Sequence, residues 1–414
     1  MRVIPHTHGV EAYRRRCGLV AHVLVGGVLL VGCATDSSTE PQPEPTATAE
    51  PVLIAPTGEV PYDEPVTLQV EHGTFEAVEV VAEGGDALAG APADDGASWV
   101  SAAPPLPSTA YSVRAEVADE VGDPVSLSAA FTVSAVPDSN RLTLTLQPGD
   151  GDVVGVGAPI VVRFDQEVSE QAAVESAMHV ASDPQVVGSW HWVSSTEAHF
   201  RPREFWPAGA RVGVNLDLNG VQAGDGLWGG RAYTYAFRIG EAQVATVDAA
   251  NHRMTVAVDG ARAGTWNTSL GRPEYATRNG TYVVLDKEKT KQMTSCSAGI
   301  TCDKNSPEYY DLKVDWSVRL TWSGTFIHSA PWSVGAQGSA NVSHGCINLS
   351  PANGKTYFSM ARYGDVVKVT NSTRDASDLV ARGDPGMVDW NQRWSDYVAG
   401  SALDRPITTD ALAG

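Results

Sequence analysis

Residues 325–348 read TFIHSAPWSVGAQGSANVSHGCIN, and this stretch decides which fold and which chemistry the sequence predicts. The apolar run Thr325-Phe326-Ile327-His328 predicts a strand that ends at the histidine. Cys346 is expected where another strand begins, so that His328 can face it across the fold. Gly345 lets the backbone approach closely and frees N–H groups at this turn.

This pairing of a cysteine with a histidine points to nucleophilic chemistry. A thiol attacks as its thiolate, so Cys346 needs a base or a cation nearby, and His328 is the candidate base. The amides beside Gly345 are candidate donors to the oxyanion of a tetrahedral intermediate. A buried structural cysteine with an unrelated histidine fits the same residues. A zinc site is a third interpretation, although the spacing of its ligands fits no standard pattern. Those ligands would be Cys296, Cys302, His328, His344 and Cys346.

The sequence around this stretch predicts strands and hairpins with little helix. Residues 254–258 alternate and precede Asp259-Gly260, which is a strong hairpin signal. A second hairpin is expected around Asn279-Gly280. Ser350-Pro351 predicts the start of a helix, with serine as N-cap and proline in the first turn. Residues 366–369 return as a strand.

Two further β-rich modules precede this region. Short alternating runs separated by turn clusters predict a sandwich over residues 52–137 and a second β module over 138–241. Tyr111 follows Pro107-Ser108-Thr109 and fits either a tyrosine corner or an ordinary core position. Three histidines of the second module are assigned to packing, namely His179, His191 and His199.

Composition excludes several classes of protein. The chain has 414 residues and 43% hydrophobic residues, which excludes disorder of the chain as a whole. Its 40 Gly and 25 Pro are too many for a coiled coil or helical bundle. A net charge of −20 is opposite to the basic footprint of nucleic-acid binders, so no nucleic-acid partner is expected. Five cysteines are too few for a disulfide scaffold.

The N-terminus predicts export. Arg14-Arg15-Arg16 precede an apolar stretch over residues 17–32, which is typical of a secretory signal. The sequence Leu30-Val31-Gly32-Cys33 resembles a bacterial lipobox, which implies cleavage after residue 32 and lipidation of Cys33. An ordinary signal peptide or an uncleaved anchor are the alternatives. Residues 33–51 contain no large apolar side chain and are expected to form a disordered tether.

His328 followed by Ser343-His344-Gly345-Cys346-Ile347-Asn348 resembles the signature of YkuD-type L,D-transpeptidases. The resemblance extends over about residues 242–370, and residues 188–209 resemble the immunoglobulin-like module of the actinobacterial members. The sequence DWNQRWS at 389–395 resembles the C-terminal extension of the mycobacterial enzymes. The fold implied is mainly β and multidomain. It comprises two immunoglobulin-like sandwiches over 52–137 and 138–241, a β-rich catalytic domain with little helix over 242–371, and a C-terminal extension over 372–414.

The resemblance also implies roles for individual residues. Cys346 would be the nucleophile and His328 the general base, later the acid, with the backbone carbonyl of Ser329 orienting the imidazole. His344 would position the loop and is the alternative base. The remaining site residues implied are Gly345 and Tyr310 near the reacting carbonyl, and Trp332, Ser343, Asn348 and Met293 in the substrate pocket.

The activity implied is attack on the third residue of a peptidoglycan tetrapeptide stem, with release of D-Ala. The thioester is then resolved by the amine of a second stem, which gives a 3→3 cross-link. No metal or organic cofactor is implied, and carbapenems are expected to acylate the thiol. The protein would be lipid-anchored to the outer face of the plasma membrane and reach into the cell wall. An L,D-carboxypeptidase and a non-catalytic wall-binding lipoprotein are the alternatives.

The resemblance places the family's lid at residues 286–310, which here contains two cysteines. Cys17 leaves with the signal peptide, Cys33 carries lipid and Cys346 must stay free, so Cys296 and Cys302 are the remaining pair. Exported proteins meet oxidising conditions, and the five residues between the two cysteines allow a tight loop. A disulfide is therefore predicted, with two free surface thiols as the alternative.

Overall fold

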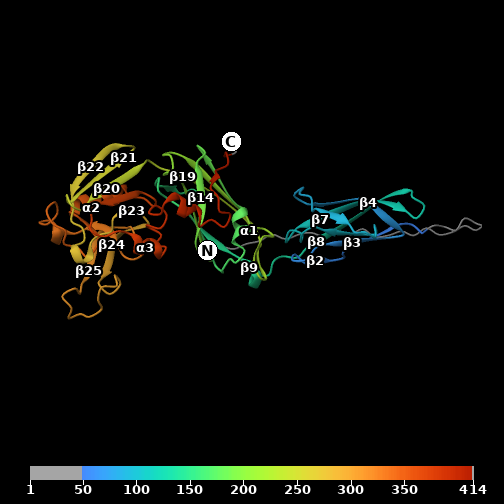
Figure 1. The fold of residues 1–414 in the computed structure, drawn as a ribbon, viewed down its shortest axis with the longest axis horizontal. Helices are drawn as coiled ribbons and strands as arrows, with labels where there is room; N and C mark the ends of the chain where they lie inside the picture. Colours follow the sequence, from blue (N-terminus) through green and yellow to red (C-terminus); the bar gives the residue numbers. More distant parts are fainter. Residues whose placement is uncertain (1–48, 413–414) are drawn as a thin grey trace, which may run out of the picture. The chain divides into compact units, whose positions relative to one another are not determined.

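The computed structural model describes residues 49–412, and it confirms a mainly β, multidomain fold (Figure 1). The predicted signal peptide, the lipidation site Cys33 and nearly all of the tether lie outside the described residues. Within residues 49–412, no helix is long and apolar enough to cross a membrane.

The first module is built from two four-stranded sheets. The alternating residues of its strands bury one face of each sheet, and Leu68, Trp99 and Val113 join in one core between them. The Tyr111 hydroxyl accepts a hydrogen bond from the Leu106 amide at 2.9 Å, which confirms the tyrosine corner. The sheets, in strand order, are β1 (Val52–Ile54), β3 (Thr67–Glu71), β6 (Ser98–Ser101), β5 (Gly90–Pro92), and β2 (Glu59–Val60), β8 (Pro124–Val133), β7 (Ala110–Asp119), β4 (Gly73–Ala82).

The second module has two larger sheets, a small third sheet and one short helix. Its first sheet contains β29 from the end of the chain, whose Thr408 pairs with Val187 of β14. That sheet runs β10 (Leu144–Gln147), β12 (Ile160–Phe164), β15 (Glu197–Pro202), β14 (Val187–Ser194), β29 (Ile407–Thr408). The other elements are β11 (Val153–Val154), β19 (Ala232–Ile239), β16 (Arg211–Asp217), β13 (Met178–Asp183), then β17 (Gln222–Gly224), β18 (Leu227–Gly229), β9 (Arg141–Leu142), and α1 (Gln171–Ser176).

The third segment contains a five-stranded and a four-stranded sheet with a common core. Helix α2 (Pro351–Met360) buries Tyr357 in that core, and its N-cap Ser350 accepts from the Asn353 amide, as the sequence predicts. The sheets run β22 (Ala261–Asn267), β21 (Arg253–Val258), β20 (Gln243–Asp248), β28 (Val366–Thr370), β23 (Gly280–Val283), and β24 (Asp286–Thr294), β25 (Asp311–Arg319), β26 (Phe326–Ser329), β27 (Ile347–Leu349). Short helices α3 (Ser377–Ala381) and α4 (Trp394–Val398) follow.

One of the two predicted hairpins is confirmed and the other is wrong. Asp259 and Gly260 join β21 to β22 with φ of 49° and 79°, which suits a tight turn of the primed type. Gly280 instead begins β23, whose antiparallel partner is β28, far along the chain. Its φ is 138°, and a Cβ there would lie 2.5 Å from the Asn391 side-chain oxygen. This glycine therefore serves a close approach and not a hairpin turn.

Candidate active site

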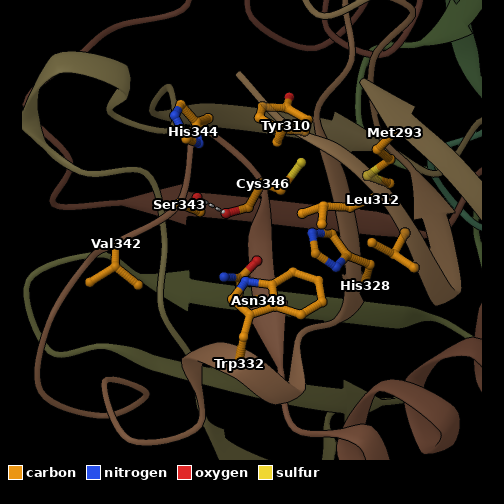
Figure 2. A pocket seen from close by; sticks show the side chains of 11 residues that line it. Met293, Tyr310, Leu312, His328, Trp332, Val342, Ser343, His344, Cys346 and Asn348 are labelled. Atoms are coloured by element: carbon orange, nitrogen blue, oxygen red, sulfur yellow. Dashed lines mark hydrogen bonds between the residues drawn. The ribbon is translucent and has the colours of Figure 1, made fainter. Parts of the chain in front are cut away.

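Two parallel strands bring the histidine and the cysteine into one cavity. In the register of β26 and β27, His328 lies opposite Asn348, and Cys346 directly precedes β27. The cavity measures about 270 Å³, and Figure 2 shows both side chains in it. It is lined by Met293, Tyr310, Leu312, Val314, His328, Trp332, Val342, Ser343, His344, Cys346 and Asn348.

A hydrogen bond to the backbone fixes the tautomer of His328. Nδ1 lies 2.9 Å from the Ser329 carbonyl oxygen. Because a carbonyl only accepts, Nδ1 carries the proton, and Nε2 of the neutral ring keeps a lone pair. Burial lowers the pKa of His328, and the bond to Ser329 offsets this only in part. The imidazole therefore rests neutral and able to take up a proton.

The Cys346 thiol is protonated at rest. Burial raises its pKa to about 11, although a hydrogen bond from the Phe326 backbone and the charge of Arg319 act in the opposite direction. Among the described residues, its sulfur donates to the Gly324 carbonyl at 3.7 Å and not to His328. The pair is thus a thiol and a neutral imidazole in one cavity, without a preformed ion pair.

The turn before the cysteine is held by its own hydrogen bonds. The Ser343 hydroxyl donates to the Cys346 carbonyl at 2.7 Å and accepts from the Gly345 amide at 3.1 Å. Thr277 donates to the Gly345 carbonyl at 2.8 Å, and Gly345 has a φ of 122°, which favours glycine. Ser343 thus shapes the turn. An oxyanion at the Gly345 amide would have to replace the Ser343 oxygen.

Asn348 and Trp332 form one wall of the cavity. The Asn348 side-chain amide donates to the Ser333 hydroxyl at 3.1 Å. Its side-chain oxygen is buried without a partner in the described part of the chain, so it can accept from a ligand N–H. Trp332 is 55% exposed, and its ring centre lies 6.0 Å from that of His328.

His344 contacts the lid through a residue that the sequence analysis missed. Its Nε2 lies 2.7 Å from a Glu308 carboxylate oxygen, and Arg272 binds the same oxygen. The hydrogen bonds from His344 and Arg272 lower the pKa of Glu308. The rings of Tyr275 and Tyr310 lie beside the imidazole at 4.9 and 5.2 Å. No local pattern around Glu308 announces this contact.

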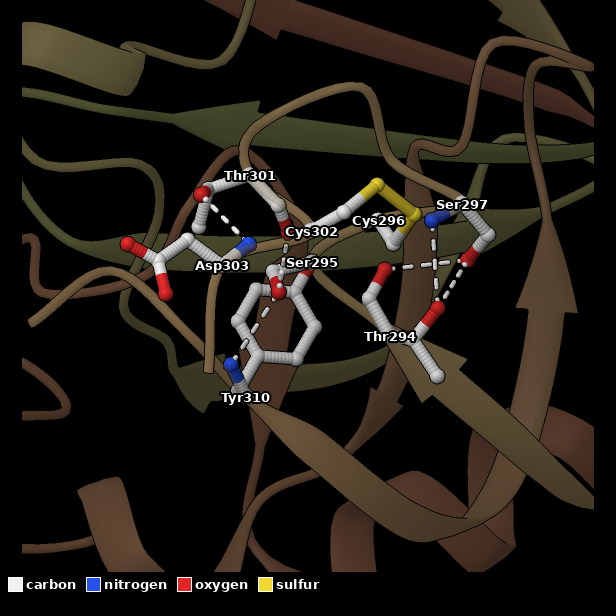
Figure 3. The surroundings of a disulfide bond; sticks show 8 residues. All are labelled: Thr294, Ser295, Cys296, Ser297, Thr301, Cys302, Asp303 and Tyr310. Atoms are coloured by element: carbon white, nitrogen blue, oxygen red, sulfur yellow. Dashed lines mark hydrogen bonds between the residues drawn. A yellow bond between two sulfur atoms is a disulfide. The ribbon is translucent and has the colours of Figure 1, made fainter. Parts of the chain in front are cut away.

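The lid is the hairpin of β24 and β25 with its long connection. Cys296 and Cys302 form a disulfide there (Figure 3), so neither can be a zinc ligand. Ser295 donates to the Thr301 carbonyl at 2.8 Å and accepts from the Tyr310 amide at 3.2 Å, which closes the loop on itself. Burial raises the pKa of Tyr310 to about 12, and the nearby Cys346 raises it too, with a smaller effect.

The apolar residues that line the cavity were also not predicted from the sequence. Leu312 and Val314 of β25 face it. Their spacing of two residues is the pattern expected for one face of a strand, and that signal was available. Val342 carries no such signal because it lies in a loop.

Comparison with known proteins identifies the family. A model described as the L,D-transpeptidase catalytic domain matches residues 242–369, and one described as a bacterial Ig domain matches 57–222, across both modules. L,D-transpeptidase 2 of Mycobacterium tuberculosis is 35% identical over 344 residues, which cover 83% of this chain and 82% of the relative. L,D-transpeptidase 5 of the same species is 34% identical over 98% of this chain and 89% of its own length. A solved L,D-transpeptidase in complex with imipenem is 37% identical, covers 56% of this chain and 99% of its own, and has a TM-score of 0.49. The chain belongs to the L,D-transpeptidase family, with an immunoglobulin-like region before a YkuD catalytic domain.

Proposed function

We propose that this L,D-transpeptidase forms 3→3 cross-links through an acyl-enzyme on Cys346. The thiol attacks the carbonyl of the third residue of a donor tetrapeptide stem, and D-Ala leaves. The amine of a second stem then attacks the thioester and releases the thiol. The observation that carries this proposal is the single cavity that holds the Cys346 thiol and the proton-accepting Nε2 side of His328.

The resting protonation states define the role of His328. Because both groups are neutral, the proton leaves sulfur as the carbon–sulfur bond forms, and Nε2 takes it up. The thiol first turns from the Gly324 carbonyl towards the imidazole. The imidazolium then protonates the departing D-Ala nitrogen. In the second step the neutral ring accepts a proton from the attacking amine and returns it to sulfur.

The donor stem is assigned to the cavity lined by Trp332 and Asn348. The unpartnered Asn348 oxygen would accept from an N–H of the stem, and the exposed Trp332 ring would cover its apolar part. Met293 closes the cavity from the lid. A carbapenem presents a strained acyl group to the same thiol, so we assign Cys346 as its site of acylation.

The place of action is assigned to the outer face of the plasma membrane. The basic and apolar residues 14–32, followed by Cys33, support export and lipidation. A lipid anchor would supply proximity to the wall, since a net charge of −20 does not attract an anionic polymer. The test is expression of Cys33→Ala in an actinobacterial host. Loss of the lipid mass from the N-terminal peptide is expected. Lipid that remains on the Cys33→Ala chain, or a wild-type chain without lipid on Cys33, would contradict the anchor.

The experiment that tests the activity is incubation of the purified chain with a disaccharide-tetrapeptide, followed by mass analysis. A dimer that has lost one D-Ala is the expected product. Loss of D-Ala alone would identify an L,D-carboxypeptidase, and no turnover would identify a binding protein. Cys346→Ala is the matched control for background hydrolysis.

A further inference from the structure

Cys346 borders a second cavity, of about 480 Å³, with a different lining. His344, Tyr310 and Cys346 line both cavities, whereas His328 and Trp332 line only the first. A group bound in the second cavity would therefore reach the Cys346 sulfur without entering the first cavity, to which the donor stem is assigned.

The second cavity is rich in guanidinium groups. Arg278, Arg374 and Arg382 line it together with Asp378. Arg278 donates to Asp378 through two nitrogens, one of them at 2.6 Å, and Arg374 lies 3.1 Å from the same carboxylate. The hydrogen bond from Arg278 lowers the pKa of Asp378 to about 2, so it stays charged. The Asp378 carboxylate thus binds two guanidinium groups, those of Arg278 and Arg374.

Arg382 is the third guanidinium of this cavity, and it acts on the Asp378 carboxylate only through its charge, without a salt bridge. Within residues 49–412 its side chain has no ion-pair partner, and it is exposed. Glu274, the other acid of the lining, pairs with Arg272 at 3.4 Å. The cavity therefore keeps an excess of positive charge, in a chain whose net charge is −20. Such a site selects an anion, and a guanidinium matches a carboxylate with two parallel hydrogen bonds.

We propose that the second cavity binds a carboxylate of the acceptor stem through Arg382, with Arg374 beside it. This rests on the proposed function, which places the donor stem in the first cavity and leaves the acceptor to approach Cys346 from another side. The bound acceptor directs its amine at the thioester carbonyl. A carbon–nitrogen bond forms, the carbon–sulfur bond breaks, and His328 carries the proton from nitrogen to sulfur.

The test compares Arg382→Gln with wild type in the full exported chain. Its matched control is Arg262→Gln, an exposed position of β22 that lines neither cavity and loses the same charge. We expect the acceptor KM to rise about threefold to tenfold, the loss expected for one partly solvated charged hydrogen bond. Carbapenem acylation and the release of D-Ala in the first turnover, before the acceptor reacts, should not change. Arg382→Lys should restore part of the effect.

A second acceptor sharpens the comparison. With a stem whose carboxylates are converted to carboxamides, wild type and Arg382→Gln should show the same KM. An unchanged acceptor KM for the carboxylate stem overturns the proposal. Slower D-Ala release with an unchanged acceptor KM also overturns it, because the cavity would then hold the leaving amino acid. A wild-type enzyme that makes no dimer fails the proposed function itself.

Discussion

Cys346 is a protonated, part-buried thiol, so its reactivity depends on His328 and not on a resting negative charge. Replacing it with alanine removes one sulfur atom at a turn that Ser343 and Thr277 hold independently. We therefore expect Cys346→Ala to lose cross-linking and the carbapenem adduct. Its thermal midpoint should stay within about 3 °C of wild type. Intact-mass analysis and calorimetry measure both. A retained adduct would place the nucleophile elsewhere.

The two histidines of the site should differ in their effect on acylation. His328→Ala removes the general base, for which a loss of about 10²- to 10⁴-fold is expected. His344→Ala removes a contact with Glu308 and should be milder. Acylation rates measured with one carbapenem compare the two variants directly. The reverse order would make His344 the base.

The pH dependence of acylation follows from the lowered pKa of His328. A base must be neutral to accept the thiol proton. Because burial lowers the pKa of His328, its imidazole stays neutral down to a pH below the ordinary pKa of about 6.5. The rate should therefore be flat near pH 7 and fall only below about pH 6.5. A profile of kcat/KM against pH gives this apparent pKa. An acidic limb centred above 6.5 would point to another group.

At the scale of elements, the lid combines a disulfide with a charged contact. The short loop that Cys296 and Cys302 close is worth about 2 kcal/mol in the chain-entropy model, which is too little to decide global folding. Reduction should therefore alter carbapenem acylation before it unfolds the catalytic domain. The double variant Cys296→Ser/Cys302→Ser should match the reduced enzyme.

Counting thiols tests the disulfide directly. A chain that lacks residues 1–33 has three cysteines, at 296, 302 and 346. Alkylation after unfolding without reductant should modify one of them. Three modified cysteines would show that the bond is absent.

The contact from Glu308 to His344 and Arg272 makes a separate prediction for the lid. Glu308→Gln keeps the shape of the side chain but removes the negative charge that contacts both His344 and Arg272. Acylation should slow by about threefold to tenfold, as expected for the loss of a charge-assisted contact near the surface. Glu274→Gln is the matched control, since Glu274 is exposed and, within the described part of the chain, pairs with Arg272 alone. If Glu308→Gln and Glu274→Gln are acylated at equal rates, the Glu308 contact does not help to position the lid.

Local elements were more predictable than their partners. Asp259-Gly260 and Ser350-Pro351 determine a turn and a helix start through their own backbone preferences, so both were found from the sequence. The partner of β23 was not, because sheet pairing depends on side chains far along the chain. The same applies to Glu308, whose importance arises only when folding brings it to His344.

At the scale of the whole chain, the C-terminal extension joins the catalytic domain to the second module. Its β29 pairs with β14, and its aromatic residues pack over a cation of that module. The guanidinium of Arg201 lies 4.6, 5.0 and 4.3 Å from the ring centres of Trp390, Trp394 and Tyr397. The sequence DWNQRWS suggested an extension, but not that it completes a sheet of another module.

A buried charge lies at this junction and makes the stability depend on pH. His199 is fully buried, and its two ring nitrogens lie 2.9 Å from Asp389 and 2.7 Å from Glu197. Since carboxylates only accept, both nitrogens donate and the ring is an imidazolium. Burial lowers its pKa, but the charge of Asp389 and then Glu197 outweigh this and raise it to about 9.

A pKa raised by folding stabilises the protein at low pH and not at high pH. The contribution from His199 should be fully present below about pH 6.5, where the unfolded ring is also charged, and be lost as pH rises through about 9. Its size is about 3 kcal/mol for a shift of this order. The unfolding midpoint of wild type should thus fall between pH 6.5 and 9. Asp389→Asn should start lower and show a flatter dependence, whereas Asp396→Asn, an exposed acid of the same extension, should keep the wild-type slope. Parallel curves for wild type and Asp389→Asn would show that His199 is neutral in the folded protein.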